Sequence, residues 1–576
     1  MSVEEIREAA LRHAVHNAVT HEGKAQPGPV IGRIMAGFPE MRGKAKEVNE
    51  IVSPVVSEVN SWSQEKQVSV LEERWPELVE SRKKAEERKT LPPLKNVDRF
   101  EIVKTRFAPN PDGALHLGSA EPIIFCDEYA KMYDGRFILR FEDTSPDVKT
   151  PITEVYEWIE EDLEWLGVKV DEKYIQSDRI DIYYGYAARL LEMGSAYVCT
   201  CTSQAFKELY MAKEACPCRS NSSEDNLKRW MKMLDGTFKK GDAVVRIKTD
   251  LEHPNPAVRD WPALRIAEGV HPRQGDKYRV WPLYNFSCAI DDHEMKVSHI
   301  IRGKEHEVNT TRQRYLSVHL GWEFPEVINI GRLGLEVGVL SKSRIRSGIE
   351  DGSFTGWDDP RVGTLRSLKR RGLLPETIRE VMIQVGPKPI NATLSWDYIA
   401  SVNRKIVEPR ARRFTFVRDP VNLKVMCILG EHDVRLPSHP DHPEFGSRDY
   451  SVRADKGETV FVVSGEDAEK MRGGGFARLM GLFNIEITHL GSGEIRASFH
   501  SKSHQEARER DFPFVHWLPS GVGIQARVVM PDASTAQGIA EEGCRNLEEG
   551  SMIQFERFGF VRVDRKSPFV AYYTHR

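Results

Sequence analysis

The chain has 576 residues and a formal charge of −4 at pH 7, from 82 Lys and Arg against 86 Asp and Glu. A single hydrophobic core stops growing well below this length, so we expect several domains. The charge balance excludes a globally basic protein but not a local basic surface. Apolar runs stay well short of the roughly 20 residues of a membrane span and the start lacks a signal-peptide pattern, so we expect a cytoplasmic protein that contacts no membrane.

Residues 1–97 are predicted to form a helical N-terminal extension. Apolar residues recur there at helical spacing, as at Val48, Ile51, Val52, Val55 and Val59. Pro54 lies within this pattern, and we expect it to interrupt the helix. The charged run 80–89 precedes two prolines and is interpreted as a linker.

From residue 98 the pattern changes to alternating strands and helices. A predicted strand over 99–107 is followed by the loop "PNPDGALHLGS", a helix over 122–133 and a strand over 135–141. This order is a βαβ unit of a parallel sheet. We therefore predict a Rossmann-like core whose two halves are residues 98–196 and 276–350.

The loop in this unit has the residue types of a phosphate site. Gly113 and Gly118 allow close approach of the backbone, and the helix that follows directs its N-terminus at whatever the loop holds. His116 adds a side-chain donor. Taken alone, such a loop is most often a turn, and the sequence has no P-loop pattern to support a nucleotide site of that kind.

Residues 197–275 are predicted to be an insertion that carries a cysteine cluster. Two C-x-C pairs separated by fourteen residues comprise Cys199, Cys201, Cys216 and Cys218. Four thiolates in two close pairs can surround Zn²⁺ tetrahedrally, so we expect a structural zinc ion. Reduced buried thiols and disulfides are the alternatives.

A second motif, "VLSKSR", follows at residues 339–344. Lys342 lies between Ser341 and Ser343 in a glycine-rich neighbourhood. We expect this lysine to swing over a triphosphate and stabilise the charge on departing pyrophosphate. An ordinary surface loop is the alternative.

The remaining sequence divides into a connector and a β region. Residues 351–413 are predicted to be a helical connector, and from 360 onward they hold twelve Lys or Arg against four acids. These cations would contact an RNA backbone or line a solvated helix face. Short apolar runs broken by Gly, Pro and Asp predict two β-barrels over residues 414–576.

Together these motifs resemble a known family. The loop and "VLSKSR", about 230 residues apart, are similar to the paired signatures of class I aminoacyl-tRNA synthetases. "RFAPNPDG", "LRFEDTSP", "YNFSCAIDDH" and "GWDDPR" resemble the branch that handles glutamate and glutamine. "FVHWLPS" and "IQFERFGFVRVD" resemble its β-barrel anticodon domains. Bacterial glutamyl enzymes end in helical domains instead, so the chain is identified as archaeal-type glutamyl-tRNA synthetase.

The resemblance implies an ATP site, with two departures from the usual signatures. Ser119 replaces a second histidine, and Val339 and Leu340 replace Lys and Met. The implied catalytic residues are His116 and Lys342. The implied ATP-binding residues are Pro109, Gly113, His116, Gly118, Ser119, Ser341, Lys342 and Ser343.

It also implies a glutamate site. Glu142 would bind the α-ammonium, Tyr284 would donate to the side-chain end, and Arg106 would meet carboxylate oxygens. Arg302 would pair with the γ-carboxylate, where glutamine enzymes have a small neutral side chain. The alternatives are a salt bridge of Arg302 with Glu305 or Glu307, and pairing of Glu142 with Arg140 or capping of the next helix.

The implied function is ATP-dependent ligation of L-glutamate to the 3′ end of tRNA(Glu) through a glutamyl-adenylate, with Mg²⁺. tRNA(Gln) is a second candidate RNA partner, and we expect a monomer. The family mechanism implies attack by the 2′-hydroxyl of the terminal ribose and a need for tRNA in the first step. The alternatives are a glutaminyl-tRNA synthetase, a non-catalytic tRNA-binding paralogue, and a nucleotidyltransferase that modifies another small acid on the same core.

Overall fold

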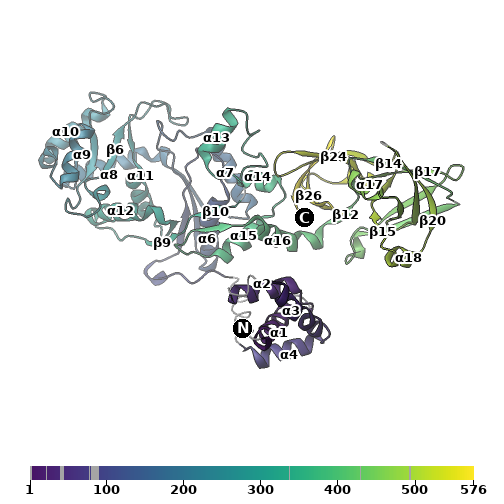
Figure 1. Cartoon of the computed structure of the whole chain (residues 1–576). Coiled ribbons are helices and arrows are strands. Elements are labelled where there is room, and N and C mark those ends of the chain that lie inside the picture. The colour runs from purple at the N-terminus through teal and green to yellow at the C-terminus, as the bar shows by residue number, and fades with distance from the viewer. Residues whose placement is uncertain are drawn as a thin grey trace. The chain divides into compact units, whose positions relative to one another are not determined.

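The computed structural model describes residues 3–20, 23–38, 45–76, 78, 90–336, 338–428, 430–491 and 494–576. The chain divides into two compact units, Met1–Thr90 and Leu91–Arg576 (Figure 1). Within the described ranges, every helix is too short or too polar to cross a bilayer.

The first unit is helical, as predicted. Its helices are α1 (Val3–Thr20), α2 (Pro27–Gly37), α3 (Ala45–Asn60) and α4 (Gln64–Arg74). Helix α3 continues through Pro54, so the expected interruption is wrong. The buried side chains of Val52, Val55 and Val59 pack this helix into the apolar core of the unit, which offsets the hydrogen bond that proline cannot donate. The predicted linker 80–89 lies outside the described residues.

A five-stranded parallel sheet forms the centre of the second unit and confirms the Rossmann-like core. Its order is β3-β2-β1-β8-β9, and every neighbouring pair is parallel. The strands are β1 (Lys104–Phe107), β2 (Arg136–Phe141), β3 (Glu172–Ile175), β8 (His299–Gly303) and β9 (Glu326–Ile330). Strand β2 lies on one side of β1 and strand β8 on the other, so the direction in which strands are added to the sheet reverses at β1. Ligands bind at such a switch point, outside the carboxyl ends of the strands.

Four helices belong to this core, namely α6 (Leu117–Met132), α7 (Thr153–Trp165), α11 (Tyr284–Glu294) and α12 (Glu307–Leu320). Helix α6 begins five residues earlier than predicted, directly at His116, so the glycine loop leads straight into its first turn. Strand β1 is shorter than predicted: Arg99 ends a 3-10 turn, residues 100–103 are irregular, and the strand begins at Lys104.

Between the halves of the core lies an insertion with its own antiparallel sheet. The strands are β4 (Ala196–Cys199), β5 (Val244–Ile247), β6 (Pro262–Ile266) and β7 (Val280–Pro282), hydrogen-bonded in that order. The helices around it are α8 (Ile180–Glu192), α9 (Ser203–Ala212) and α10 (Ser223–Leu234). Within the second unit, Figure 1 shows this sheet at one end of the parallel-sheet core and the barrels at the other.

The connector is helical and is tied back to the core. Helix α13 (Lys342–Glu350) precedes it, and its own helices are α14 (Leu365–Arg370), α15 (Pro375–Val385) and α16 (Trp396–Val407). Strands β10 (Leu333–Leu335) and β11 (Ala392–Leu394) pair in parallel and join the connector to the segment after β9.

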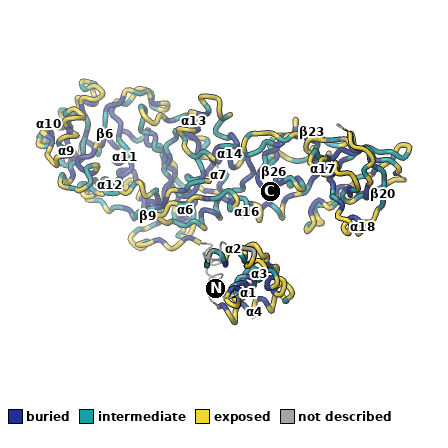
Figure 2. Tube along the Cα trace, in the orientation of Figure 1, coloured by how far each residue is buried: buried dark blue, intermediate teal, exposed yellow. Residues whose placement is uncertain are grey.

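Two seven-stranded, nearly closed sheets confirm the C-terminal barrels. The first contains β12 (Arg412–Phe414), β13 (Phe416–Arg418), β23 (Ile524–Val529), β24 (Thr535–Ala540), β25 (Met552–Phe555), β26 (Gly559–Arg565) and β27 (Phe569–His575). The second contains β14 (Val421–Met426), β17 (Thr459–Val463), β18 (Gly475–Leu479), β19 (Asn484–Leu490), β20 (Glu494–Ser501), β21 (Phe514–Val515) and β22 (Trp517–Pro519). Both barrels have buried interiors (Figure 2).

The second barrel is inserted between strands β13 and β23 of the first. The additional elements of this region are the hairpin β15 (Glu431–Pro437) and β16 (Ser447–Arg453), and the short helices α17 (Gly465–Met471) and α18 (His504–Glu509). The domain boundaries proposed within 98–576 stay predictions.

Candidate active site

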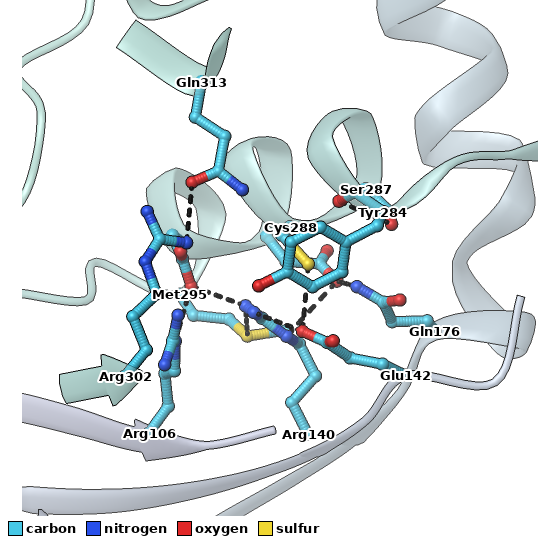
Figure 3. Close-up of polar contacts among 12 residues, drawn as sticks. Arg106, Arg140, Glu142, Gln176, Tyr284, Ser287, Cys288, Met295, Arg302 and Gln313 are labelled. Atoms are coloured by element: carbon cyan, nitrogen blue, oxygen red, sulfur yellow. Dashed lines mark hydrogen bonds and ion pairs between the residues drawn. The ribbon is translucent and has the colours of Figure 1, made fainter. Parts of the chain in front are cut away.

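The predicted amino-acid-binding residues converge at the carboxyl edge of the parallel sheet (Figure 3). Arg106 is on β1, Glu142 follows β2, and Arg302 is on β8. Tyr284 is the first residue of α11. Three neighbouring parallel strands therefore end at one pocket, as expected at a switch point.

Buried ion pairs form the floor of this pocket. Asp292 Oδ1 accepts from Arg140 Nη1 at 2.7 Å and from Arg106 Nε at 3.2 Å. Burial alone would raise the pKa of Asp292, but the two guanidinium groups hold it below its ordinary value. Asp291, its neighbour on α11, accepts from Arg179 Nε at 2.9 Å. Each of these charges thus has an opposite partner, which buried charges require.

The two carboxylate oxygens of Glu142 differ in their contacts. Its Oε1 accepts from Arg140 Nη2 at 3.1 Å and from the Cys288 thiol at 2.9 Å. Burial and the nearby carboxylate raise the pKa of Cys288 well above its usual value, so the thiol stays a donor. The predicted alternative, pairing with Arg140, is therefore present. Among the described residues Oε2 accepts no hydrogen bond, which leaves it available to an ammonium group.

Arg302 is buried and has neutral partners. Nη1 donates to Gln313 Oε1 at 3.0 Å and Nη2 donates to Thr310 Oγ1 at 2.7 Å. Only 6% of the residue is exposed, and no carboxylate in the described ranges lies within ion-pair distance of it. The alternative salt bridge with Glu305 or Glu307 is therefore not formed.

Tyr284 closes the pocket from α11. Its ring lies 5.4 Å from that of His306, measured between centroids. Burial, followed by the charges of Cys288 and Glu142, raises the pKa of Tyr284, so the hydroxyl remains a donor. Figure 3 shows this hydroxyl on the side of the ring that faces Arg302 and Arg106.

The glycine loop is packed tightly around the start of α6. A Cβ on Gly113 would lie 2.6 Å from Cη2 of Trp357, and one on Gly118 would lie 3.1 Å from the His116 ring. The His116 N–H donates to Ser119 Oγ at 3.4 Å. Burial, then the nearby charges of Lys342 and Arg332, lower the pKa of His116 to about 4, so its imidazole is neutral at pH 7.

The second motif lies against this loop. Lys342 is the first residue of α13, and its Nζ donates to Asp112 Oδ1 at 2.8 Å and to the Asn110 carbonyl at 3.3 Å. Burial lowers the pKa of Lys342, although Asp112 opposes this effect. The hydroxyls of Ser341 and Ser343 lie 3.1 Å apart. Two segments more than 200 residues apart are therefore in contact.

One further segment connects both motifs, and we name residues 357–365 the bridging segment. Gly363 O accepts from Leu117 N at 3.0 Å, and Gly363 N donates to Val339 O at 2.9 Å. Leu365 N donates to Leu115 O at 2.9 Å. A third link runs from the loop to the amino-acid pocket, because Pro109 O accepts from Glu142 N at 2.9 Å. Backbone hydrogen bonds therefore link the glycine loop to the second motif, through the bridging segment, and directly to Glu142.

Several residues of the pocket were not identified from the sequence. Asp292 and Arg140 carry a visible signal, since an acidic pair stands within the apolar face of α11 and a charge stands within the apolar strand β2. Gln313, Thr310 and Asp112 carry none. Their importance comes from contacts with side chains that are distant in the sequence or lie on another element.

The four cysteines of the insertion meet around one point. Their Sγ atoms all lie within 4.8 Å of one another, with Cys216 Sγ 3.5 Å from Cys199 and 3.3 Å from Cys201. All four are free thiols, which excludes the disulfide alternative. Hydrogen bonds from Thr200 and Arg229 outweigh burial and lower the pKa of Cys218 to about 7. Zinc–sulfur bonds of about 2.3 Å place tetrahedral sulfurs about 3.8 Å apart, so this donor set fits Zn²⁺.

Comparisons with known proteins agree with these features. Residues 102–409 match the family described as tRNA synthetases class I (E and Q), catalytic domain. Residues 411–503 and 514–564 match the two anti-codon binding domains of the same family.

Similar proteins are found in archaea. The glutamate–tRNA ligase of Thermococcus kodakarensis is 51% identical over 100% of both chains. That of Pyrococcus furiosus is 50% identical over 99% of this chain and 100% of its own. That of Methanopyrus kandleri is 45% identical over 98% of each.

Proposed function

Because this chain belongs to the class I tRNA synthetases of the E and Q family, we propose that it ligates L-glutamate to the 3′ end of tRNA(Glu), with ATP and Mg²⁺. The relatives that match it along their whole length carry the name glutamate–tRNA ligase. The observation that carries the choice of amino acid is Arg302, a buried guanidinium with neutral partners. We also propose that it acts as a monomer.

The charges of the pocket favour an acidic substrate. Arg106, Arg140 and Arg302 face Glu142 and Asp292, while Asp291 is matched by Arg179. One positive charge therefore remains, and free glutamate carries one net negative charge. Glutamine is neutral overall and would leave Arg302 buried without a counter-charge. Removing one partner of a buried ion pair costs about 3–5 kcal/mol, enough for a discrimination of several hundredfold or more.

The activation step requires positioning and charge stabilisation. An oxygen of the substrate α-carboxylate attacks the α-phosphorus of ATP in line, the bond to the bridging oxygen breaks, and pyrophosphate leaves. Neutral His116 would donate to phosphate oxygen from the N-terminus of α6. The Lys342 ammonium would leave Asp112 and bind the departing pyrophosphate. Bound Mg²⁺ would neutralise triphosphate charge.

The remaining loop residues have supporting roles in this proposal. Gly113 and Gly118 permit close approach of the nucleotide, and Pro109 and Ser119 shape the loop around it. Ser341 and Ser343 would donate to phosphate beside Lys342. In the second step the terminal ribose hydroxyl of tRNA attacks the anhydride carbonyl carbon, and AMP leaves.

A structural Zn²⁺ belongs to the proposal as well. Cys199, Cys201, Cys216 and Cys218 would hold it, and the observed separations of their sulfurs support a tetrahedral site. The ion would tie the end of β4 to the turn after α9, at the centre of a small satellite core in the insertion.

Pyrophosphate exchange tests the proposed activity. With tRNA(Glu) present, exchange should depend on glutamate, and kcat/KM for glutamate should exceed that for glutamine by about 10³-fold or more. The reverse preference would indicate a glutaminyl enzyme. No exchange with either amino acid would indicate a non-catalytic tRNA-binding protein. Aminoacylation of purified tRNA(Glu) and tRNA(Gln) then decides between the two RNA partners.

A further inference from the structure

Gln313 is a buried side chain of α12 whose amide oxygen lies 3.0 Å from Arg302 Nη1. We propose that Gln313 is a specificity-determining positioning residue, which orients Arg302 without neutralising its charge. The inference deepens the proposed function and rests on it. Selection of an acidic substrate would then depend on the neutrality of the residues that hold Arg302, as much as on Arg302 itself.

The geometry shows that both Gln313 and Thr310 accept hydrogen bonds from Arg302. A guanidinium has only donors, so Gln313 must turn its amide oxygen toward it. Thr310 lies three residues earlier, on the same face of α12, and its hydroxyl donates to His306 O at 3.3 Å. Its lone pairs therefore remain for Arg302 Nη2, at 2.7 Å. One helix face thus holds the guanidinium with two neutral acceptors.

The other arginines at this pocket differ from Arg302 in that each contacts a carboxylate. Arg106 and Arg140 share Asp292, and Arg179 has Asp291. Each has a carboxylate, as buried arginines usually do. Among these four arginines, the excess positive charge is therefore located at Arg302. A carboxylate at position 313 would remove the excess, and the pocket would no longer be electrostatically complementary to a substrate with net charge −1.

Gln313→Glu is a sharp test, because it keeps the size of the side chain and adds the carboxylate. We expect KM for glutamate to rise about 10²-fold while kcat changes less than about fivefold, because the lost interaction is made with bound substrate. The preference for glutamate over glutamine should narrow by a similar factor. Gln313→Met is the matched control, since it removes the hydrogen bond without adding charge. It should raise KM less than about tenfold and keep most of the preference.

Equal effects of the two variants on KM and on preference would overturn the inference, because Gln313 would then act through packing alone. Thr310→Asp, which brings a carboxylate to the other side of the guanidinium, should act in the same direction as Gln313→Glu. It provides the same comparison if the first variant fails to fold. A wild-type enzyme that prefers glutamine would overturn the proposed function first, and the inference with it.

Discussion

Lys342 shows how single side chains complete this site across long sequence separations. Its ammonium is held by Asp112 and by the Asn110 carbonyl, both in the glycine loop. The same loop carries His116, whose pKa is depressed partly by Lys342. A lysine so placed can transfer from a carboxylate to a phosphate by a small side-chain movement. This placement supports the proposed role of Lys342, in which it stabilises negative charge that develops on the leaving group.

Lys342→Ala should slow pyrophosphate exchange by about 10²-fold or more and leave the affinity for tRNA(Glu) within about twofold. The reason is that, in the proposed role, the ammonium acts on the transition state of activation and not on bound tRNA. Exchange kinetics and a filter-binding titration measure the two quantities. Lys342→Arg is the control that retains charge, and it should recover part of the rate. Parallel loss of rate and tRNA affinity would contradict the assigned role.

At this scale the sequence predicts residue types better than their partners. The motifs predicted His116, Lys342, Arg302 and Glu142. The structure brings Arg302 and Glu142 together at the carboxyl edge of the sheet (Figure 3) and places Lys342 against the loop that carries His116. Asp292 and Gln313 act through contacts with Arg140 and Arg302, and such contacts depend on how strands and helices pack. The local pattern marks Asp292 as an unusual buried acid but does not give its partners, and it gives no sign of Gln313.

At the scale of elements, local sequence patterns predict a helix or strand correctly where its own residues determine its structure. The strand, glycine loop, helix and strand of the βαβ unit were predicted in the right order, although α6 begins at Leu117, five residues before the predicted start. Such patterns fail where tertiary packing overrides them. Helix α3 retains Pro54 because its valines are buried on one face. The order of the barrels was not predictable either, since β12 and β25 pair across more than 130 residues.

The cysteine cluster is an element-scale feature that metal analysis can test. Protein purified without chelator should contain about one zinc per chain, and Cys201→Ser should reduce this amount. Loss of the ion should lower the unfolding temperature of the insertion, because the chain from β4 to η5 (Pro217–Ser220) packs around the four sulfurs. Cys544→Ser, at a buried cysteine in the first barrel, is the control and should leave the zinc content unchanged. Zinc-free wild-type protein would contradict the site.

At the scale of the whole second unit, polar contacts join the helical connector to the first barrel. Arg370 on α14 donates to Asp564 on β26 through Nε and Nη2, and to Asp358 through Nη1 at 2.9 Å. Asp358 adjoins Trp357, which packs against Gly113 of the glycine loop. The bridging segment that hydrogen-bonds to both motifs is therefore anchored, through Arg370, on the barrel at its other end.

Asn403 on α16 forms a second joint of this kind. Its Oδ1 accepts from Leu374 N at 3.0 Å and Thr377 Oγ1 at 2.7 Å, and its Nδ2 donates to Gly372 O at 3.2 Å. The second Nδ2 donor faces His575 Nε2 on β27, at 3.0 Å. All four hydrogen-bonding positions of the amide are occupied, which fixes its orientation. His575 must therefore be a neutral acceptor, because an imidazolium would present a donor to a donor.

This requirement predicts how stability depends on pH. Burial, the largest cause, lowers the pKa of His575 to about 4, whereas the unfolded chain has a value near 6.5. Between pH 6.5 and pH 4 the imidazole of His575 is mostly protonated in the unfolded state and mostly neutral in the folded state. The stabilisation that the neutral imidazole contributes is therefore complete above pH 6.5 and declines toward pH 4. The loss at pH 5 should be about 2 kcal/mol in the free energy of unfolding. Denaturant titrations at pH 7 and pH 5 measure it.

His575→Gln separates this effect from the other titrating groups. A glutamine oxygen can still accept from Asn403 but does not titrate between pH 4 and 7. The difference in unfolding free energy between pH 7 and pH 5 should therefore be about 2 kcal/mol smaller in the variant than in the wild type. His116, whose pKa is also near 4, is present in both proteins and cancels in the comparison. Identical pH dependence in the two proteins would mean that the joint between α16 and β27 accommodates a charged imidazole.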